Sequence, residues 1–142
     1  MSSSGHQYFF HQYLQIARLF TKHLNDELAR HDLYHSQWAI IYYLKQHAPS
    51  TLVEISNYLN VEKPTITRTV TRLEERKLIE QVPSDNKREK RIQLTSEGKA
   101  IYNTCIVIVN KFEEKVMSTV SENEMNLTIE VLNKMQNQLQ HE

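Results

Sequence analysis

Apolar side chains recur at helical spacing in the first part of the chain. Residues 6–32 contain no glycine or proline, and apolar residues there follow one another at intervals of four and three. These residues are Phe9, Tyr13, Ile16, Phe20, Leu24 and Leu28. Such spacing keeps side chains on one face of an α-helix. The pattern therefore predicts one long helix from His6 to Asp32, with an apolar face rich in aromatic rings.

Two shorter helices are predicted next. One runs from Ser36 to His47, and Ala48-Pro49-Ser50 ends it, because the residue before a proline avoids the helical region. The other begins where Thr51-Leu52-Val53-Glu54 fits a capping box. In a capping box the threonine oxygen accepts from the third amide, while the glutamate reaches back to the cap amide. This helix is predicted to end near Leu59.

A fourth helix follows the turn Asn60–Lys63. It is predicted to run from Pro64 to Lys77, because proline suits the first position of a helix. Its apolar residues, again at intervals of four and three, predict a buried stripe of Ile66, Val70 and Leu73. The other face then presents Thr67, Arg68, Thr71 and Arg72.

The pattern changes to that of strands after Leu78. Ile79–Val82 is short and contains β-branched residues, Pro83–Asn86 is rich in turn formers, and Lys90–Leu94 alternates polar and apolar residues. These segments predict a β-hairpin whose loop is rich in basic residues.

Two helices complete the predicted fold. Thr95 can cap the first, whose apolar stripe consists of Ile101, Cys105, Ile108, Phe112 and Val116. Ser121-Glu122-Asn123-Glu124 is a second capping box. It opens a last helix with apolar positions at Met125, Ile129, Leu132, Met135 and Leu139.

Length and composition agree with a mainly helical protein. The chain has 142 residues, about one domain's worth, and contains only two glycines and three prolines, so a many-turned β-sandwich is not expected. The predicted fold class is mainly α with a small β-hairpin, in a single domain over residues 1–142. No stretch approaches the ~18 apolar residues of a membrane span, and the polar start has no signal-peptide pattern. A cytoplasmic protein that does not associate with membranes is therefore expected.

The net charge of zero hides an uneven distribution. Residues 1–61 carry four basic and four acidic side chains, residues 62–99 carry ten and seven, and residues 100–142 carry three and six. The total argues against a protein that grips DNA by bulk charge. Between Lys63 and Arg91, however, there are nine basic and five acidic side chains. This local excess is compatible with DNA binding by a few cations at defined positions.

Two short helices joined by a tight turn and followed by a basic hairpin have the order of a winged helix-turn-helix. In such a pair the second helix enters the major groove of DNA. Arginine can donate two hydrogen bonds to guanine, and threonine offers a hydroxyl or a methyl group. The hairpin loop carries Lys87, Arg88, Lys90 and Arg91, which can reach phosphates or a minor groove.

At these residues the sequence resembles the MarR family of bacterial transcription regulators. Thr67-Arg68 with Leu73, Glu74 and Leu78-Ile79 is similar to the family's recognition helix and its exit. The run from Asp85 through Arg88 to Leu94-Thr95, with Gly98 beyond it, resembles the family's wing and the helix that follows. The candidate DNA-binding residues are Lys63, Pro64, Thr65, Thr67, Arg68, Thr71, Arg72, Asn86, Lys87 and Arg88.

The sequence departs from the family pattern in two places. The family usually has Asp-x-Arg at the wing tip, where this chain has Asn86-Lys87-Arg88 with Asp85 one step earlier. The arginine is retained, whereas the carboxylate that would orient it is displaced by one position. The recognition helix begins Glu62-Lys63-Pro64, where the family often has small hydroxyl residues, so its capping or phosphate contacts could differ.

The resemblance implies a homodimer on a pseudo-palindromic DNA operator. Residues 33–95 would form the winged-helix part, and residues 6–32 and 96–142 would be dimerisation helices. Two-fold proteins of this kind read half-sites about one DNA turn, ~10 bp, apart. The family mostly represses genes and is released by small ligands, oxidants or metals. A repressor with a small-molecule effector, and without a cofactor, is therefore expected.

Several features have a second interpretation. The polar face of the fourth helix could simply be solvated, and Arg76 and Lys77 are expected to pair with Glu74, Glu75 or Glu80 rather than with DNA. The single cysteine, Cys105, lies on an apolar stripe, so it is either a small buried hydrophobe or a redox sensor. The aromatic residues that could line an effector pocket, or serve in core and dimer packing, are Tyr8, Tyr13, Tyr34, Trp38, Tyr42 and Tyr43.

Other function classes have less support in the sequence. The histidines lack ligand-like spacing, since His31 and His35 are separated by a predicted helix break and His6, His11 and His23 share no pattern. No acid/base pair, nucleophile elbow, phosphate-binding glycine loop or metal motif is present, so an enzyme is not expected. The alternative to a DNA-binding regulator is a helical adaptor that binds another protein through its terminal helices.

Overall fold

The computed structural model describes residues 3–83 and 89–141. The chain divides into two compact units, Met1–Val109 and Asn110–Glu142, and each is described by itself. The first unit holds a group of helices and a small sheet. The second consists mainly of one helix.

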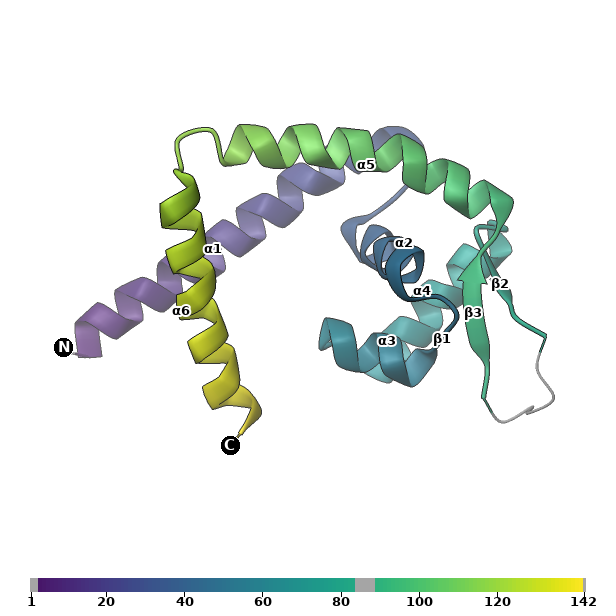
Figure 1. Cartoon of the computed structure of the whole chain (residues 1–142), viewed down its shortest axis with the longest axis horizontal. Coiled ribbons are helices and arrows are strands. Elements are labelled where there is room, and N and C mark those ends of the chain that lie inside the picture. Colours follow the sequence, from purple (N-terminus) through teal and green to yellow (C-terminus); the bar gives the residue numbers. More distant parts are fainter. Residues whose placement is uncertain (1–2, 84–88, 142) are drawn as a thin grey trace. The chain divides into compact units, whose positions relative to one another are not determined.

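The long first helix of the prediction is confirmed, with a different end. Helix α1 spans Ser3–Leu28 and continues as a short 3-10 helix, η1, over Ala29–His31. Asp32 then adopts the left-handed conformation (φ 54°), which stops the helix. Helix α2 follows at His35–His47, close to its predicted bounds. Figure 1 shows these elements in purple and blue.

The two short helices that come next form the predicted helix-turn-helix pair. Helix α3 spans Leu52–Leu59 and has the predicted capping box, in which Thr51 Oγ1 accepts from the Glu54 amide at 3.1 Å. Asn60 turns the chain in the left-handed conformation (φ 54°), which asparagine tolerates better than most residues. Helix α4 spans Lys63–Glu75, so Pro64 is its second rather than its first residue.

Helix α4 ends two residues before the predicted position at Lys77. Arg76 is the cap residue, and Lys77 lies in the left-handed region (φ 62°). The amides of Lys77 and Leu78 donate to the carbonyls of Glu74 and Leu73 at 2.9 and 3.0 Å. This is the Schellman arrangement, which satisfies the last carbonyls of a helix. Periodicity alone did not reveal it because glycine, its usual marker, is absent.

A three-stranded antiparallel sheet contains the predicted hairpin. Strands β2 (Ile79–Gln81) and β3 (Arg91–Leu94) pair with Ile79 opposite Leu94. An additional two-residue strand that the sequence did not predict, β1 (Ser50–Thr51), pairs with the other side of β3. The strand order is therefore β1-β3-β2, and β3 lies in the middle of the sheet.

The core of the first unit lies where α2 packs against α3, α4 and β3 (Figure 1). Its fully buried apolar side chains include Leu28, Leu33, Ile40, Ile41, Leu44, Ile55, Val70, Leu73 and Ile92. Burying each such side chain contributes roughly 1.5–3 kcal/mol. The predicted stripe of α4 is part of this core, which fixes the direction of that helix's opposite face.

Helix α5 spans Ser96–Val116. Its predicted cap is confirmed, because Thr95 Oγ1 accepts from the Gly98 amide at 3.0 Å. In the second unit, helix α6 spans Glu122–Gln140, and its capping box has Ser121 Oγ accepting from the Glu124 amide at 3.1 Å. No helix in the described part of the chain is long and apolar enough to cross a membrane.

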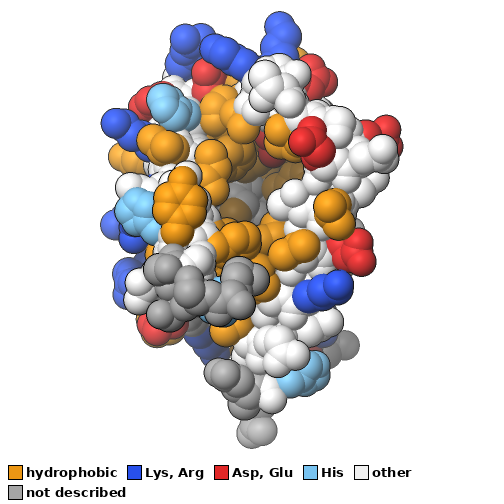
Figure 2. All heavy atoms as spheres, turned by 90° about the vertical axis from the view of Figure 1, so that its left-hand side faces the viewer, with side chains coloured by type: hydrophobic (Ala, Val, Ile, Leu, Met, Phe, Trp, Pro, Cys, Tyr) orange, Lys and Arg blue, Asp and Glu red, His pale blue; other side chains and the backbone are white. Residues whose placement is uncertain are grey.

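Only the end of α1 is buried in the chain's own core. Leu24 and Leu28 are buried, whereas apolar side chains nearer the start of the helix are 43–67% exposed. The exposed ones are Tyr8, Phe9, Phe10, Tyr13, Leu14, Ile16 and Leu19. Figure 2 shows hydrophobic side chains among the exposed atoms on this side of the molecule. A helix that exposes this many apolar side chains is typical of a protein–protein contact.

Candidate nucleic-acid interface

Helix α4 separates its residues into a buried and an exposed face. Ile66, Val70 and Leu73 are at most 2% exposed and pack into the core. The seven candidate residues of the recognition helix lie within its first ten positions: Lys63, Pro64, Thr65, Thr67, Arg68, Thr71 and Arg72. All are exposed except Thr65, which is half-buried. The structure thus brings these candidates together on one helix.

The threonine hydroxyls of α4 donate to the helix's own backbone. Thr67 Oγ1 bonds the Lys63 carbonyl at 3.0 Å, and Thr71 Oγ1 bonds the Thr67 carbonyl at 2.8 Å. These bonds use the hydroxyl proton and leave oxygen lone pairs and a methyl group on the exposed side chain. Such groups can accept from a base amino group or contact a thymine methyl.

The cations of α4 have no carboxylate partner within the described part of the chain. Lys63, Arg68 and Arg72 form no ion pair there, and Arg68 Nη2 donates to the neutral Thr65 Oγ1 at 3.2 Å. The cap residue, Glu62, makes no side-chain hydrogen bond to the helix start. The exposed face of α4 therefore offers three positive charges to an anionic partner.

The wing is described only in its strands. The candidate residues Asn86, Lys87 and Arg88 lie outside the described residues, and the departure at the wing tip lies there too. Lys90 directly precedes β3, and Arg91 is its first residue. Both side chains form ion pairs. They differ in this respect from the cations of α4.

The expectation that Arg76 pairs with a nearby carboxylate is wrong. Arg76 instead donates to the backbone carbonyls of Asp32 at 2.5 Å and His31 at 3.4 Å. Glu74 is already paired with Lys90 at 2.8 Å. The guanidinium ties the end of α4 to the segment between η1 and α2, a contact between residues more than forty positions apart that helical spacing could not indicate.

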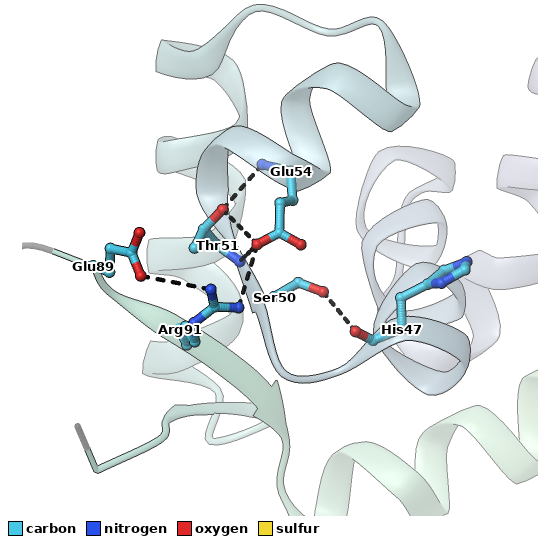
Figure 3. Close-up of polar contacts among 6 residues, drawn as sticks. All are labelled: His47, Ser50, Thr51, Glu54, Glu89 and Arg91. Carbon is cyan, nitrogen blue, oxygen red and sulfur yellow. Dashed lines mark hydrogen bonds and ion pairs between the residues drawn. The ribbon is translucent and has the colours of Figure 1, made fainter. Parts of the chain in front are cut away.

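Sequence reasoning also missed the role of Glu54 beyond its helix cap. Its Oε1 accepts from Thr51 and lies 3.3 Å from Arg91 Nη1 (Figure 3). The capping box was visible in the sequence, but the arginine is 37 residues away. Its proximity depends on strand β1, which is too short to give a pattern of its own.

The aromatic residues that could line an effector pocket do not form one group. Trp38 stacks on Tyr102 with ring centroids 5.6 Å apart, and Tyr42 lies beside both rings. Tyr43 contacts His47 and Tyr58 instead. The remaining candidates, Tyr8, Tyr13 and Tyr34, are exposed. The described contacts favour ordinary packing for Trp38 and Tyr43, which are both buried.

Burial shifts the pKa of Cys105 and of His35, which both lie outside α4 and the wing. Cys105 is buried, and burial raises the pKa of its thiol, which lowers the reactive thiolate fraction. Burial likewise lowers the pKa of His35, whose amide donates to Asn25 Oδ1 at 2.7 Å. Within residues 3–83 and 89–141, no three His, Cys, Asp or Glu side chains could jointly hold a metal ion.

Comparisons with known proteins agree on one family. The model of the MarR family matches residues 33–90. The chain is 42% identical over 112 residues to YwoH, an uncharacterized HTH-type transcriptional regulator of Bacillus subtilis. The aligned region covers 79% of this chain and 82% of that protein. It is similar to Staphylococcus aureus MarR in complex with salicylate and kanamycin, with a TM-score of 0.86, 33% identity, and 99% and 95% of the two chains covered. It is also similar to the Staphylococcus aureus MepR–DNA complex, with a TM-score of 0.82, 25% identity, and 90% and 94% covered.

Proposed function

Because the chain belongs to the MarR family, we propose that it is a transcription regulator that binds double-stranded DNA as a homodimer and represses genes until a small ligand or other signal releases it. The observation that carries the proposal is the exposed face of α4. There Lys63, Arg68 and Arg72 stand without carboxylate partners in the described chain, on a helix whose opposite face is locked in the core.

In the proposed complex, α4 enters the major groove. Arg68 reads a guanine edge, Thr67 and Thr71 contact bases or phosphates, and Lys63 and Arg72 neutralise phosphates. Pro64 and Thr65 place the start of the helix close to the backbone. The wing tip, with Asn86, Lys87 and Arg88, is proposed to contact neighbouring DNA, as the family resemblance implies. The MepR–DNA complex among the similar structures supports DNA binding by this fold.

The proposed homodimer gives the terminal helices their role. Residues 33–95 would read DNA, while residues 6–32 and 96–142 would pair with a second copy. The exposed apolar residues of α1 support this division, because an isolated domain rarely leaves so much apolar surface in water. A two-fold dimer would read a pseudo-palindrome with half-site centres ~10 bp apart.

The proposed release by a small molecule rests on one relative. The similar Staphylococcus aureus MarR is bound to salicylate and kanamycin, which supports a small organic effector for this chain. No catalytic step is part of the proposal. Since the partner is chromosomal DNA, the proposed place of action is the cytoplasm.

The experiment is a binding titration with the DNA upstream of the protein's own gene. A labelled fragment of this DNA is titrated with the protein. The titration is repeated in the presence of unlabelled competitor DNA, which has either the same or a scrambled sequence. We expect binding that the specific fragment displaces and the scrambled one does not. Addition of salicylate as the probe should weaken it. Equal competition by both DNAs would contradict a sequence-specific regulator and favour a protein-binding adaptor.

A further inference from the structure

Two ion pairs tie the start of strand β3 to both helices of the helix-turn-helix pair. Lys90 Nζ lies 2.8 Å from Glu74 Oε1 on α4, and Arg91 Nη1 lies 3.3 Å from Glu54 Oε1 on α3. The two cations are consecutive in the sequence, but their partners belong to different helices. The strand that leads into the wing is therefore held from two directions.

The sheet register explains why Arg91 meets Glu54. Thr51 of β1 is paired directly with Arg91 of β3, and Thr51 is also the cap residue of α3. Glu54 Oε1 accepts from the Thr51 hydroxyl at 3.1 Å and from its amide at 3.4 Å. Arg91 thus meets a carboxylate that the capping box already orients (Figure 3). Its other nitrogen, Nη2, lies 3.5 Å from Glu89 Oε2.

The short strand β1 is itself held in place. Ser50 is fully buried, and its hydroxyl donates to the His47 carbonyl at 2.7 Å (Figure 3). The Glu54 side chain is 47% exposed, but its hydrogen bonds to Thr51 join its carboxylate to this anchored segment. A pre-oriented partner reduces the side-chain entropy that an exposed ion pair has to lose.

The second pair links the wing to the recognition helix directly. Glu74 follows the fully buried Leu73 on α4, so the position of its backbone is set by the core. The side chains of Lys90 and Glu74 are 35% and 25% exposed, which makes this the better shielded of the two pairs. Because Arg68 and Arg72 lie on the same helix, the pair connects the direction of the wing to the face that carries these cations.

We propose that Lys90 and Arg91 are positioning residues, which set the direction of the wing relative to α4 and contact no DNA phosphate. This inference rests on the proposed DNA-binding function. On the exposed face of α4, by contrast, Lys63, Arg68 and Arg72 lack carboxylate partners in the described chain. A phosphate contact by Lys90 or Arg91 would instead have to compete with, or share the cation with, an existing carboxylate partner.

The two roles predict opposite effects when a carboxylate is neutralised. If Lys90 or Arg91 touched a phosphate, removing the negative charge of Glu74 or Glu54 would strengthen DNA binding. If they position the wing, the same changes weaken it. Glu74→Gln and Glu54→Gln are suitable variants, because glutamine keeps the size of the side chain and also serves in a capping box.

The experiment measures the affinity of the full-length protein for its upstream DNA over a series of salt concentrations. We expect Glu74→Gln, Glu54→Gln, Lys90→Gln and Arg91→Gln each to weaken binding about two- to thirtyfold, from pairs worth ~0.2–1 kcal/mol in each of two subunits. The slope of log K against log salt should stay unchanged. The double variants Glu74→Gln/Lys90→Gln and Glu54→Gln/Arg91→Gln should be no weaker than their single variants, because each pair acts as a unit.

A matched control is Lys63→Gln, which should reduce the salt slope by about 1.8 in a dimer that loses one phosphate contact per subunit. A similar reduction in Lys90→Gln or Arg91→Gln, or tighter binding by Glu74→Gln or Glu54→Gln, would overturn the positioning role. Thermal unfolding of each variant without DNA distinguishes a destabilised fold from a folded protein whose wing is misplaced. The charge swap Lys90→Glu/Glu74→Lys should restore affinity for DNA. If the wild type shows no specific binding at all, the proposed function fails first, and this inference with it.

Discussion

Gly98 lies near the start of α5, where the backbone of Leu78 passes close to the helix. A Cβ atom there would lie 2.1 Å from the Leu78 carbonyl oxygen and 3.3 Å from Leu94 Cβ. The same oxygen accepts from the Thr95 amide at 3.1 Å, while Thr95 Oγ1 donates to the Lys77 carbonyl at 2.6 Å. The residue that caps α5 is thereby joined to the turn that follows α4, and only glycine leaves space for that approach.

Replacing Gly98 with alanine should therefore destabilise the fold. The added methyl group forces backbone apart, and overpacking of this kind costs about 1–3 kcal/mol or more. Urea unfolding followed by circular dichroism measures the change. The matched control is Lys99→Ala at the exposed neighbouring position, which should shift the midpoint little. Equal midpoints for the two variants would show that the close approach is relaxed at no cost.

Arg68 is the side chain of α4 best suited to read a base. Its only described hydrogen bond is to Thr65, which it can exchange for a guanine. Arg68→Ala should weaken specific binding by ~1–3 kcal/mol and relax the preference at one base pair of each half-site. Competition with single-base variants of the operator tests this. Arg30→Ala, at an exposed arginine of η1, is the control. A uniform loss over all sequences would indicate a phosphate contact instead.

At the scale of elements, local patterns predicted most of the fold. The stripe of Ile66, Val70 and Leu73 indicated which face of α4 is buried, and the two capping boxes located the starts of α3 and α6. Strand β1 was missed because two residues show no alternation. The partners of Arg76 and Arg91 were also missed, since both depend on contacts between distant segments. The exposed face of α4 could thus be predicted, whereas the ion pairs at the start of β3 could not.

The capping box of α6 should make that helix sensitive to acid. Hydrogen bonds from Ser121 lower the pKa of Glu124 below its ordinary value. A carboxyl group with a lowered pKa stabilises the folded state above its unfolded pKa, and this contribution is lost as the pH falls through the folded pKa. Glu124→Gln keeps an acceptor but no charge. It should unfold at a lower temperature than the wild type at neutral pH.

This difference should shrink as the pH approaches about 3, where glutamates become protonated. Thermal unfolding followed by circular dichroism at several pH values measures it. Glu130→Gln, which lies on the same helix beyond its first turn, is the control and should lack this pH dependence. A constant difference between Glu124→Gln and the wild type at all pH values would exclude the charge as its cause.

At the scale of the whole molecule, the charges offset one another by region. The basic excess over residues 62–99 is matched by an acidic excess over residues 100–142, which leaves a net charge of zero. Bulk attraction to DNA is then weak, so the proposed DNA affinity would have to come from a few cations and from the two subunits of the proposed dimer. The exposed apolar side chains of α1 are the surface that would join the subunits.

A charge placed on that surface should separate the proposed dimer. Ile16 is 56% exposed in the single chain, and Ile16→Glu would bury an unpaired carboxylate if the surface pairs with a second copy. Sedimentation equilibrium should show a shift from dimer to monomer, with a parallel loss of operator affinity. The control is Gln15→Glu, at an exposed polar position of the same helix. A dimer that survives Ile16→Glu with wild-type affinity would place the interface elsewhere.

The division of α4 into two faces also makes the protein a candidate for redesign. The residues that hold the helix in the core, Ile66, Val70 and Leu73, share no position with four of those proposed to contact DNA, Thr67, Arg68, Thr71 and Arg72. A library that varies only the second set would leave the buried packing untouched. Selection for a new target sequence could then proceed on a constant scaffold, provided that Glu74 is kept to hold the wing.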